Sequence, residues 1–151
     1  MLVARLKNGA LIELTKRWTK KELVTLKNTE TFFCPCCRGE VILKLGTKKQ
    51  WHFAHVRENA LCQTFEKESD IHLLGKKQLY LWLKKTKQTV YLEKFFPQCK
   101  QRPDIYYEHR KRKVAVEFQC SPISYELHYK RTLSYLNDGI YPLWIIGAHH
   151  L

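Results

Sequence analysis

The chain has 151 residues, 44% hydrophobic and 27% charged, a composition typical of a globular protein that buries a core without disulfides. Lys and Arg number 27 against 14 Asp and Glu, so the net charge of +13 favours a polyanionic partner, although a basic protein need not bind nucleic acid. No apolar run approaches the ~20 residues of a membrane span, and no signal peptide is evident, so we expect a cytoplasmic protein with six reduced cysteines.

The first 65 residues are predicted to hold a hairpin, a short helix and two further strands. Two alternating apolar runs flank Asn8-Gly9, a strong signal for a tight turn. Thr19 and Glu22 have the spacing of a capping box, which marks a helix start. The two later strands are joined at Gly46. These elements are expected at 2–14, 19–27, 41–45 and 50–53.

From residue 66 onward the pattern predicts the order α-β-β-β-α-β. Ser124 is the expected N-cap of the second helix, which Gly139 closes. The basic run 109–113 is expected to be an exposed hairpin loop. The last strand is apolar on both faces, so we expect it to be buried. These elements are expected at 66–85, 89–93, 104–107, 114–120, 125–136 and 143–146.

A C-x-x-C pair, two histidines in the sequence HFAH and one more cysteine lie within residues 34–62. Zinc takes four nitrogen or sulfur ligands in a tetrahedron, and a C-x-x-C turn supplies two of them on one side. The competing interpretation is a set of buried thiols and surface imidazoles. We predict a structural zinc ion bound by Cys34, Cys37, His55 and Cys62, with His52 as the alternative fourth ligand and Cys36 as an alternative to Cys37.

Two acidic residues lie in neighbouring predicted strands. Asp104 opens one strand, and Glu117 lies inside the next, where alternation places Glu117 and Gln119 on one face and Phe118 on the other. An unpaired buried carboxylate is costly, and coordination of Mg²⁺, which prefers carboxylate oxygens, would offset that cost. An ion pair with Lys or Arg would do the same, so both interpretations stay open.

A third group of polar side chains lies on the first predicted helix of this half. Glu68, His72 and Lys76 are spaced by four residues and therefore share one helix face. A carboxylate, an imidazole and an amine in a row are typical of an active-site wall. The spacing alone favours an exposed ladder of charges over an active site.

Taken together, these features resemble the CoiA-like competence protein family. The likeness extends over nearly the whole chain, and the ordered set of motifs is more specific than any one of them. In chain order the matching motifs are CPCC at 34–37, HFAH at 52–55, Cys62, ESDIH at 68–72, Lys76, RPDI at 102–105, AVEFQCS at 115–121, Ile123-Ser124 and LWI at 143–145.

The resemblance implies an α/β (α+β) protein with two parts. Residues 1–63 would be a small β-rich zinc-knuckle module, and residues 64–151 a PD-(D/E)XK restriction-endonuclease-like domain with the order αβββαβ. Members act in natural transformation on incoming DNA and its recombination. The family pattern also implies that Asp104 and Glu117, with the main-chain carbonyl near Phe118, bind Mg²⁺ or Mn²⁺.

The family pattern assigns further roles and shows two departures. Glu68 would be the acidic residue of the first helix, and His72 a base or phosphate contact. Gln119 stands where the motif has lysine, which helps to orient or deprotonate the attacking water; Lys76 is the expected substitute. Relatives also extend well beyond residue 151, which implies a shortened member.

Two functions follow as hypotheses. The first is a metal-dependent deoxyribonuclease acting on DNA, single-stranded or in recombination intermediates. The second is an inactive nuclease-like module that holds DNA or a recombination protein. Both predict DNA binding that weakens with salt. Tyr125 and Tyr129 are candidates for stacking on unpaired bases. The expected phosphate contacts are Lys84, Lys85, Lys111, Arg112, Lys113, Lys130 and Arg131.

Overall fold

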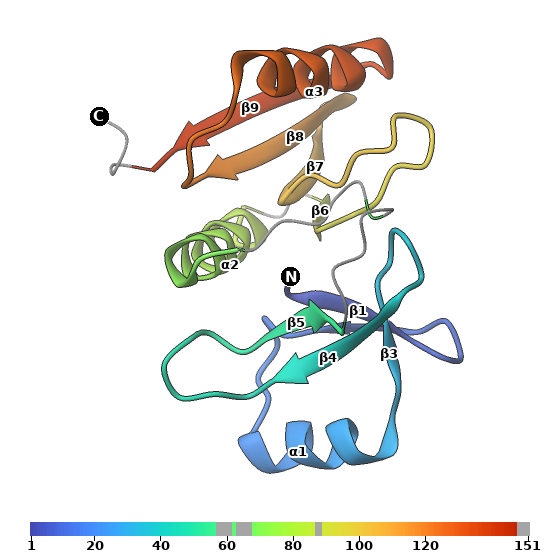
Figure 1. Ribbon diagram of the computed structural model, residues 1–151. Coiled ribbons are helices and arrows are strands. Elements are labelled where there is room, and N and C mark those ends of the chain that lie inside the picture. Colours follow the sequence, from blue (N-terminus) through green and yellow to red (C-terminus); the bar gives the residue numbers. More distant parts are fainter. Residues whose placement is uncertain (57–61, 63–67, 87–88, 148–151) are drawn as a thin grey trace. The chain divides into compact units, whose positions relative to one another are not determined.

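The computed structural model describes residues 1–56, 62, 68–86 and 89–147. They divide into two compact units, residues 1–73 and 74–151, which we describe one at a time (Figure 1). Across the described residues, none of the helices combines the length and the apolar character that crossing a bilayer requires. The predicted domain boundary between residues 63 and 64 lies outside the described residues and stays a prediction.

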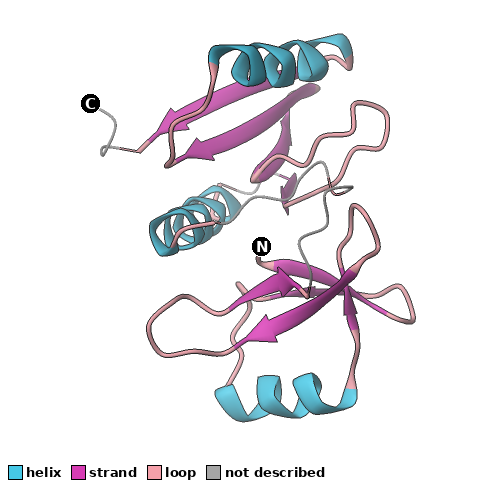
Figure 2. Ribbon diagram, viewed as in Figure 1, coloured by secondary structure: helices cyan, strands magenta, loops and turns pink. Residues whose placement is uncertain are grey.

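The first unit is built on a five-stranded antiparallel sheet with the order β2-β1-β3-β4-β5 (Figure 2). One helix, α1, joins the second strand to the third. The strands are β1 (Val3–Leu6), β2 (Leu11–Glu13), β3 (Phe32–Phe33), β4 (Glu40–Lys44) and β5 (His52–His55), and the helix is α1 (Lys20–Thr29).

The predicted hairpin and helix of this unit are confirmed. Gly9 has φ of 89°, a left-handed conformation that glycine adopts without a steric penalty, and the Ala10 N–H donates to the Asn8 side chain. Thr19 and Glu22 form the reciprocal capping box at the start of α1. Strand β3 was not predicted, because two residues are too few to show a period of alternation.

The second unit holds a four-stranded mixed sheet with the order β6-β7-β8-β9. Its first two pairings are antiparallel, and β8 pairs with β9 in parallel. The element order agrees with the one predicted from residue 66 onward. The elements are α2 (Asp70–Lys84), β6 (Thr89–Leu92), β7 (Ile105–His109), β8 (Arg112–Gln119), α3 (Tyr125–Asn137) and β9 (Ile140–Ile146), and the first four residues of α2 belong to the first unit.

Helices α2 and α3 pack on opposite faces of this sheet. The Phe118 ring of β8 lies against Gly75 of α2, whereas the neighbouring side chain, Glu117, contacts Tyr135 of α3. Successive side chains of a strand point to opposite faces, so the two contacts assign one face to each helix. Tyr135 is fully buried in the core on the α3 side, together with Tyr106, Ala115 and Ile140.

Two predicted boundaries are wrong. Helix α2 starts at Asp70 rather than at residue 66, because residues 68 and 69 are not helical, and residues 66 and 67 lie outside the described ones. The predicted loop at 109–113 is mostly strand. The chain reverses at Arg110-Lys111 alone, with φ of 48° and 66°. Two left-handed residues make the tight turn that suits the twist of a hairpin.

Strand β9 was predicted to be buried on both faces, which is also wrong. It begins at Ile140, three residues earlier than predicted, and lies at the edge of the sheet. Tyr141 and Leu143 are 60% and 47% exposed, whereas Trp144, which points to the opposite face of the strand, packs against His128 of α3. An apolar run does not reveal that only one of its faces is covered, which is why the prediction failed.

Gly75 is required by the close packing of α2 on β8. A Cβ atom added there would lie 2.2 Å from Cε1 of the Phe118 ring. We expect Gly75→Ala to lower the free energy of unfolding by about 1–3 kcal/mol through overpacking, despite alanine's gain of ~1 kcal/mol in helix propensity. Gly46→Ala, which meets nothing within 4 Å, is the control. Equal urea denaturation midpoints for both variants would contradict this packing.

Candidate functional site

Four of the predicted zinc ligands gather in the first unit. Cys34, Cys37, His55 and Cys62 each offer one ligand atom, and these four atoms all lie within 4.8 Å of one another. The Cys34 and Cys62 sulfurs are 4.0 Å apart, and the Cys37 sulfur is 3.4 Å from Nε2 of His55. Three sulfurs and one imidazole nitrogen are a donor set that suits zinc, so the cluster is able to hold such an ion.

The chain builds this cluster from a tight turn and a strand end. Cys34 follows β3, and its carbonyl accepts from Arg38, whose φ is 57°. The Gly39 N–H donates to the Cys37 sulfur at 3.4 Å. Burial, with the charge of Cys34, raises the pKa of Cys37 to about 11, and the bond from Gly39 opposes this shift. A bound cation would stabilise the thiolate against that burial.

The two alternative zinc ligands lie outside this group of four. The ring nitrogen Nδ1 of His52 is 2.8 Å from the carbonyl of Gln50. Burial lowers the pKa of His52, which keeps its imidazole neutral at physiological pH. Cys36 is also not one of the four residues whose ligand atoms lie together in this unit.

Asp104 holds the first position of the acidic site in the second unit. It immediately precedes β7 and is 8% exposed. Its Oδ2 accepts a hydrogen bond of 2.8 Å from the backbone N–H of Phe118 on β8. Its Oδ1 lies 3.1 Å from Nζ of Lys76 on α2. One carboxylate therefore joins the start of β7, the end of β8 and a helix.

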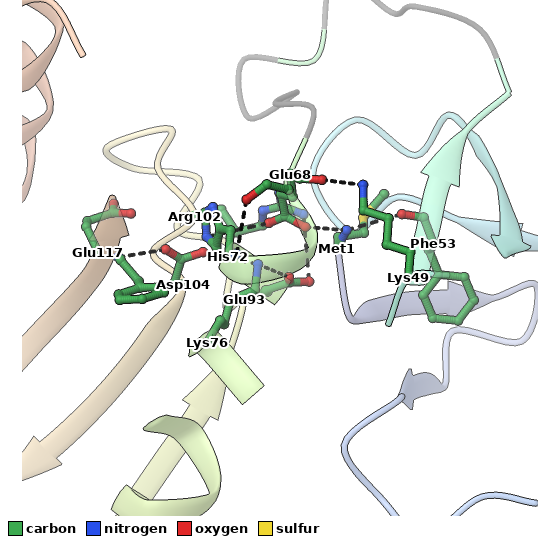
Figure 3. A network of polar contacts seen from close by, with 12 residues as sticks. Met1, Lys49, Phe53, Glu68, His72, Lys76, Glu93, Arg102, Asp104 and Glu117 are labelled. Atoms are coloured by element: carbon green, nitrogen blue, oxygen red, sulfur yellow. Dashed lines mark hydrogen bonds and ion pairs between the residues drawn. The ribbon is translucent and has the colours of Figure 1, made fainter. Parts of the chain in front are cut away.

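Lys76 is fully buried between two carboxylates (Figure 3). Its Nζ is 2.7 Å from Oε1 of Glu93, which follows β6, and 3.1 Å from Asp104. Arg102 lies 3.9 Å from the other Glu93 oxygen. The sequence prediction missed Glu93. One signal was available, because Glu93 directly follows an apolar strand run. It lies opposite Asp104 when the pairing of Leu92 with Ile105 is extended by one residue.

Glu117 is the second predicted carboxylate, and its partners come from α3. Its Oε1 accepts hydrogen bonds from Nη2 of Arg131 at 2.6 Å and from the Tyr135 hydroxyl at 2.5 Å. Burial raises the pKa of Glu117 to about 7, Asp104 adds to this increase, and Arg131 opposes it. Burial also raises the pKa of Tyr135, so its hydroxyl remains a donor.

The two carboxylates are thus engaged by different helices. Asp104 contacts Lys76 of α2, and Glu117 contacts Arg131 and Tyr135 of α3. Their convergence on one cation stays a prediction. Arg131 was expected to contact DNA phosphates, and that stays a prediction. It shares the inward face of α3 with Tyr135, four residues later, and this spacing could have revealed the pair.

The contacts of Gln119, Glu68 and His72 complete those of the predicted site residues. The Gln119 side chain donates to the Ser121 carbonyl at 2.5 Å. In the first unit, Glu68 pairs with the Met1 amino group at 2.6 Å, and its other oxygen is 4.0 Å from Nε2 of His72. Glu68 precedes α2, so the prediction that it shares a helix face with His72 and Lys76 is wrong for Glu68.

The raised pKa of Glu117 makes stability depend on pH. Relative to an ordinary value of 4.5, a folded value of about 7 favours the protonated side chain. The stabilisation of the folded state by protonated Glu117 is therefore complete below pH 4.5 and is lost as the pH rises through 7. We expect the free energy of unfolding of the wild type, relative to that of Glu117→Gln, to fall by up to about 3 kcal/mol as the pH rises through this range. Urea denaturation of the wild type and the variant across pH 4–8 measures this difference. Glu126→Gln, which changes an exposed side chain, is the control, and its difference from the wild type should not vary with pH in this way.

Two family models match the chain. Residues 68–151 match "Competence protein CoiA, nuclease-like domain", and residues 15–65 match "Competence protein CoiA, N-terminal domain". Competence protein CoiA of Bacillus subtilis (strain 168) is 42% identical over 120 residues, which are 80% of this chain and 32% of that protein. The chain therefore spans about a third of that relative's length. No solved structure matches this chain.

Proposed function

Because this chain belongs to the competence protein CoiA family, we propose that its second unit is a metal-dependent nuclease that hydrolyses DNA phosphodiesters during transformation or recombination. The fold assignment that goes with this proposal is the PD-(D/E)XK core. The observation that carries it is the placement of Asp104 and Glu117. They flank the pairing of Ile105 with Val116 at one end of the sheet, and both are buried. Hydrolysis would take place in the cytoplasm.

The amine of Lys76 supports a catalytic assignment despite the glutamine at position 119. In the family motif a lysine follows the second carboxylate by two residues, where this chain has Gln119. Here Lys76 reaches Asp104 from α2, at 3.1 Å. Its amine would orient the attacking water and offset charge that develops on the phosphate. Glu93 would hold Lys76 in place through the 2.7 Å ion pair.

The donor set at this end of the sheet suits a hard cation. Asp104, Glu117 and the main-chain carbonyl of Phe118 would bind Mg²⁺ or Mn²⁺, which supplies an activated water and neutralises the scissile phosphate. Glu68 would supply the further acidic residue of the family pattern, and His72 a base or phosphate contact. Exposed basic residues such as Lys111 would bind DNA phosphates without reading sequence.

A second candidate is a nuclease-like module that binds DNA or a recombination protein without cutting it. Two observations favour it. Each carboxylate already has a basic partner, Lys76 for Asp104 and Arg131 for Glu117. The Gln119 side chain is also engaged with the Ser121 carbonyl. Both candidates share the basic charge and the fold, so a cleavage assay separates them.

For the first unit we propose a structural zinc ion. Four protein ligands would fill its coordination sphere and leave no open position for catalysis. We expect about one equivalent of zinc in purified protein. Cys37→Ser should lower both the zinc content and the thermal stability of this unit, whereas Cys36→Ser should change neither. Zinc below half an equivalent, in protein never exposed to chelator, would contradict the site.

The nuclease proposal predicts cleavage of single- or double-stranded DNA with Mg²⁺ or Mn²⁺ and none with EDTA. Glu117→Ala should reduce the rate at least about 100-fold, because a metal ligand is lost. Glu126→Ala, an exposed carboxylate of α3, is the matched control and should cleave like the wild type. Salt-sensitive binding by the wild type without cleavage in any metal would favour the binding module.

A further inference from the structure

Arg131 reaches the buried Glu117 carboxylate from the edge of the site. Its Nη2 atom is 2.6 Å from Oε1, and its side chain is 13% exposed against 5% for Glu117. Its guanidinium carbon also lies 5.5 Å from the centre of the Trp144 ring. An aromatic face attracts a guanidinium whatever anion it pairs with. The Trp144 contact therefore holds Arg131 near Glu117 without fixing which anion it binds.

The second donor to Glu117 differs from Arg131 in its freedom to move. Tyr135 is fully buried and packs in the core with Tyr106 and Ala115. Moving its ring would open that closely packed core. Arg131 is long, partly exposed and able to turn its head group while its stem stays in place. The carboxylate thus has one fixed donor and one exchangeable donor on the same oxygen.

The charges of the site explain why an exchange matters. Lys76 is paired with Asp104 and Glu93, Arg102 lies 3.9 Å from Glu93, and Arg131 is paired with Glu117. Three acidic side chains thus meet three basic ones. A divalent cation that enters next to these pairs is repelled by Arg131 across a poorly screened interior. A phosphodiester accepts two parallel hydrogen bonds from arginine and adds negative charge. It is therefore a suitable second anion for Arg131.

We propose that Arg131 is a phosphate-binding residue that moves from Glu117 to a DNA phosphodiester, so that DNA and the divalent metal ion strengthen each other's binding. The inference rests on the proposed metal centre at Asp104 and Glu117. Without DNA, Arg131 holds Glu117 and the metal binds weakly. With DNA, Tyr135 keeps the carboxylate in place and Arg131 binds the phosphate. Linkage requires that each ligand tighten the other's binding by the same factor.

Binding of Mn²⁺ to the whole chain without DNA tests the first half, with free Mn²⁺ measured by electron paramagnetic resonance. We expect Arg131→Gln to bind Mn²⁺ about tenfold more tightly than the wild type, within the usual range of such couplings. Arg131→Lys keeps the charge and should bind like the wild type. Arg110→Gln is the matched control, since it removes an exposed guanidinium at the β7–β8 turn.

Fluorescence anisotropy of a labelled oligonucleotide, with Mn²⁺ or EDTA at matched ionic strength, tests the second half. Mn²⁺ should tighten DNA binding at least about fivefold for the wild type and less than about twofold for Arg131→Gln. The wild-type comparison needs no variant, so it can overturn the proposal even if Arg131→Gln does not fold. Equal Mn²⁺ affinity in wild type and Arg131→Gln, with the same gain in DNA affinity, would also overturn it.

The metal centre and the exchange by Arg131 can be rejected separately. Mn²⁺ binding by the wild type that is the same with and without DNA, and lost in Glu117→Gln, keeps the metal centre but rejects the exchange by Arg131. Wild-type Mn²⁺ binding that is undetectable both with and without DNA, after subtraction of binding to DNA alone, rejects the metal centre and the exchange together.

Discussion

The site of the second unit depends on the hydrogen bond from the backbone N–H of Phe118 to the Asp104 carboxylate. At 2.8 Å it joins the start of β7 to the end of β8, where the regular strand pairing has ended. The main-chain carbonyl of Asp104 meanwhile accepts from the Glu93 N–H, which adds the end of β6. Three strand ends are thus fixed around Asp104. Every side chain assigned to the site in this unit either belongs to one of these strand ends or extends toward them from a helix.

Burial of Lys76 follows from this arrangement. An ammonium group without solvent contact is tolerated only where carboxylates and hydrogen bonds replace its hydration. Glu93 and Asp104 supply that replacement, and Glu93 does so from a left-handed backbone conformation with φ of 50°. Such a conformation is strained for a residue with a side chain. A strained, buried carboxylate that pairs with a buried lysine is more typical of a functional site than of a surface ion pair.

Local signals in the sequence predicted local structure well. The Asn8-Gly9 turn and the Thr19 cap each depend on the residues beside them, and both are confirmed. The gathering of the cysteine and histidine ligands was also predictable, because their spacing carries the chemistry. The missed features depend on distant parts of the chain. Nothing near Glu93 in the sequence reveals Lys76, and nothing near Glu117 reveals Arg131.

The same distinction explains the wrong prediction for β9. Its residues alternate between a covered and an exposed face, yet both faces are apolar, so the pattern lacks the polar half that marks an open side. The position of β9 at the sheet edge is a property of the topology. The strand pattern had already linked Asp104 and Glu117 but left a metal site and an ion pair both open, and the family likeness favoured the metal site.

We propose above that Asp104 and Glu117 share one divalent cation at this end of the sheet. A crystal of the protein with a DNA oligonucleotide, grown in Mn²⁺ and measured for anomalous scattering, tests it directly. We expect a manganese peak bound by both carboxylates, with Arg131 turned to a phosphate. An anomalous map without a peak there, with the Arg131–Glu117 and Lys76–Asp104 pairs intact beside bound DNA, would contradict it.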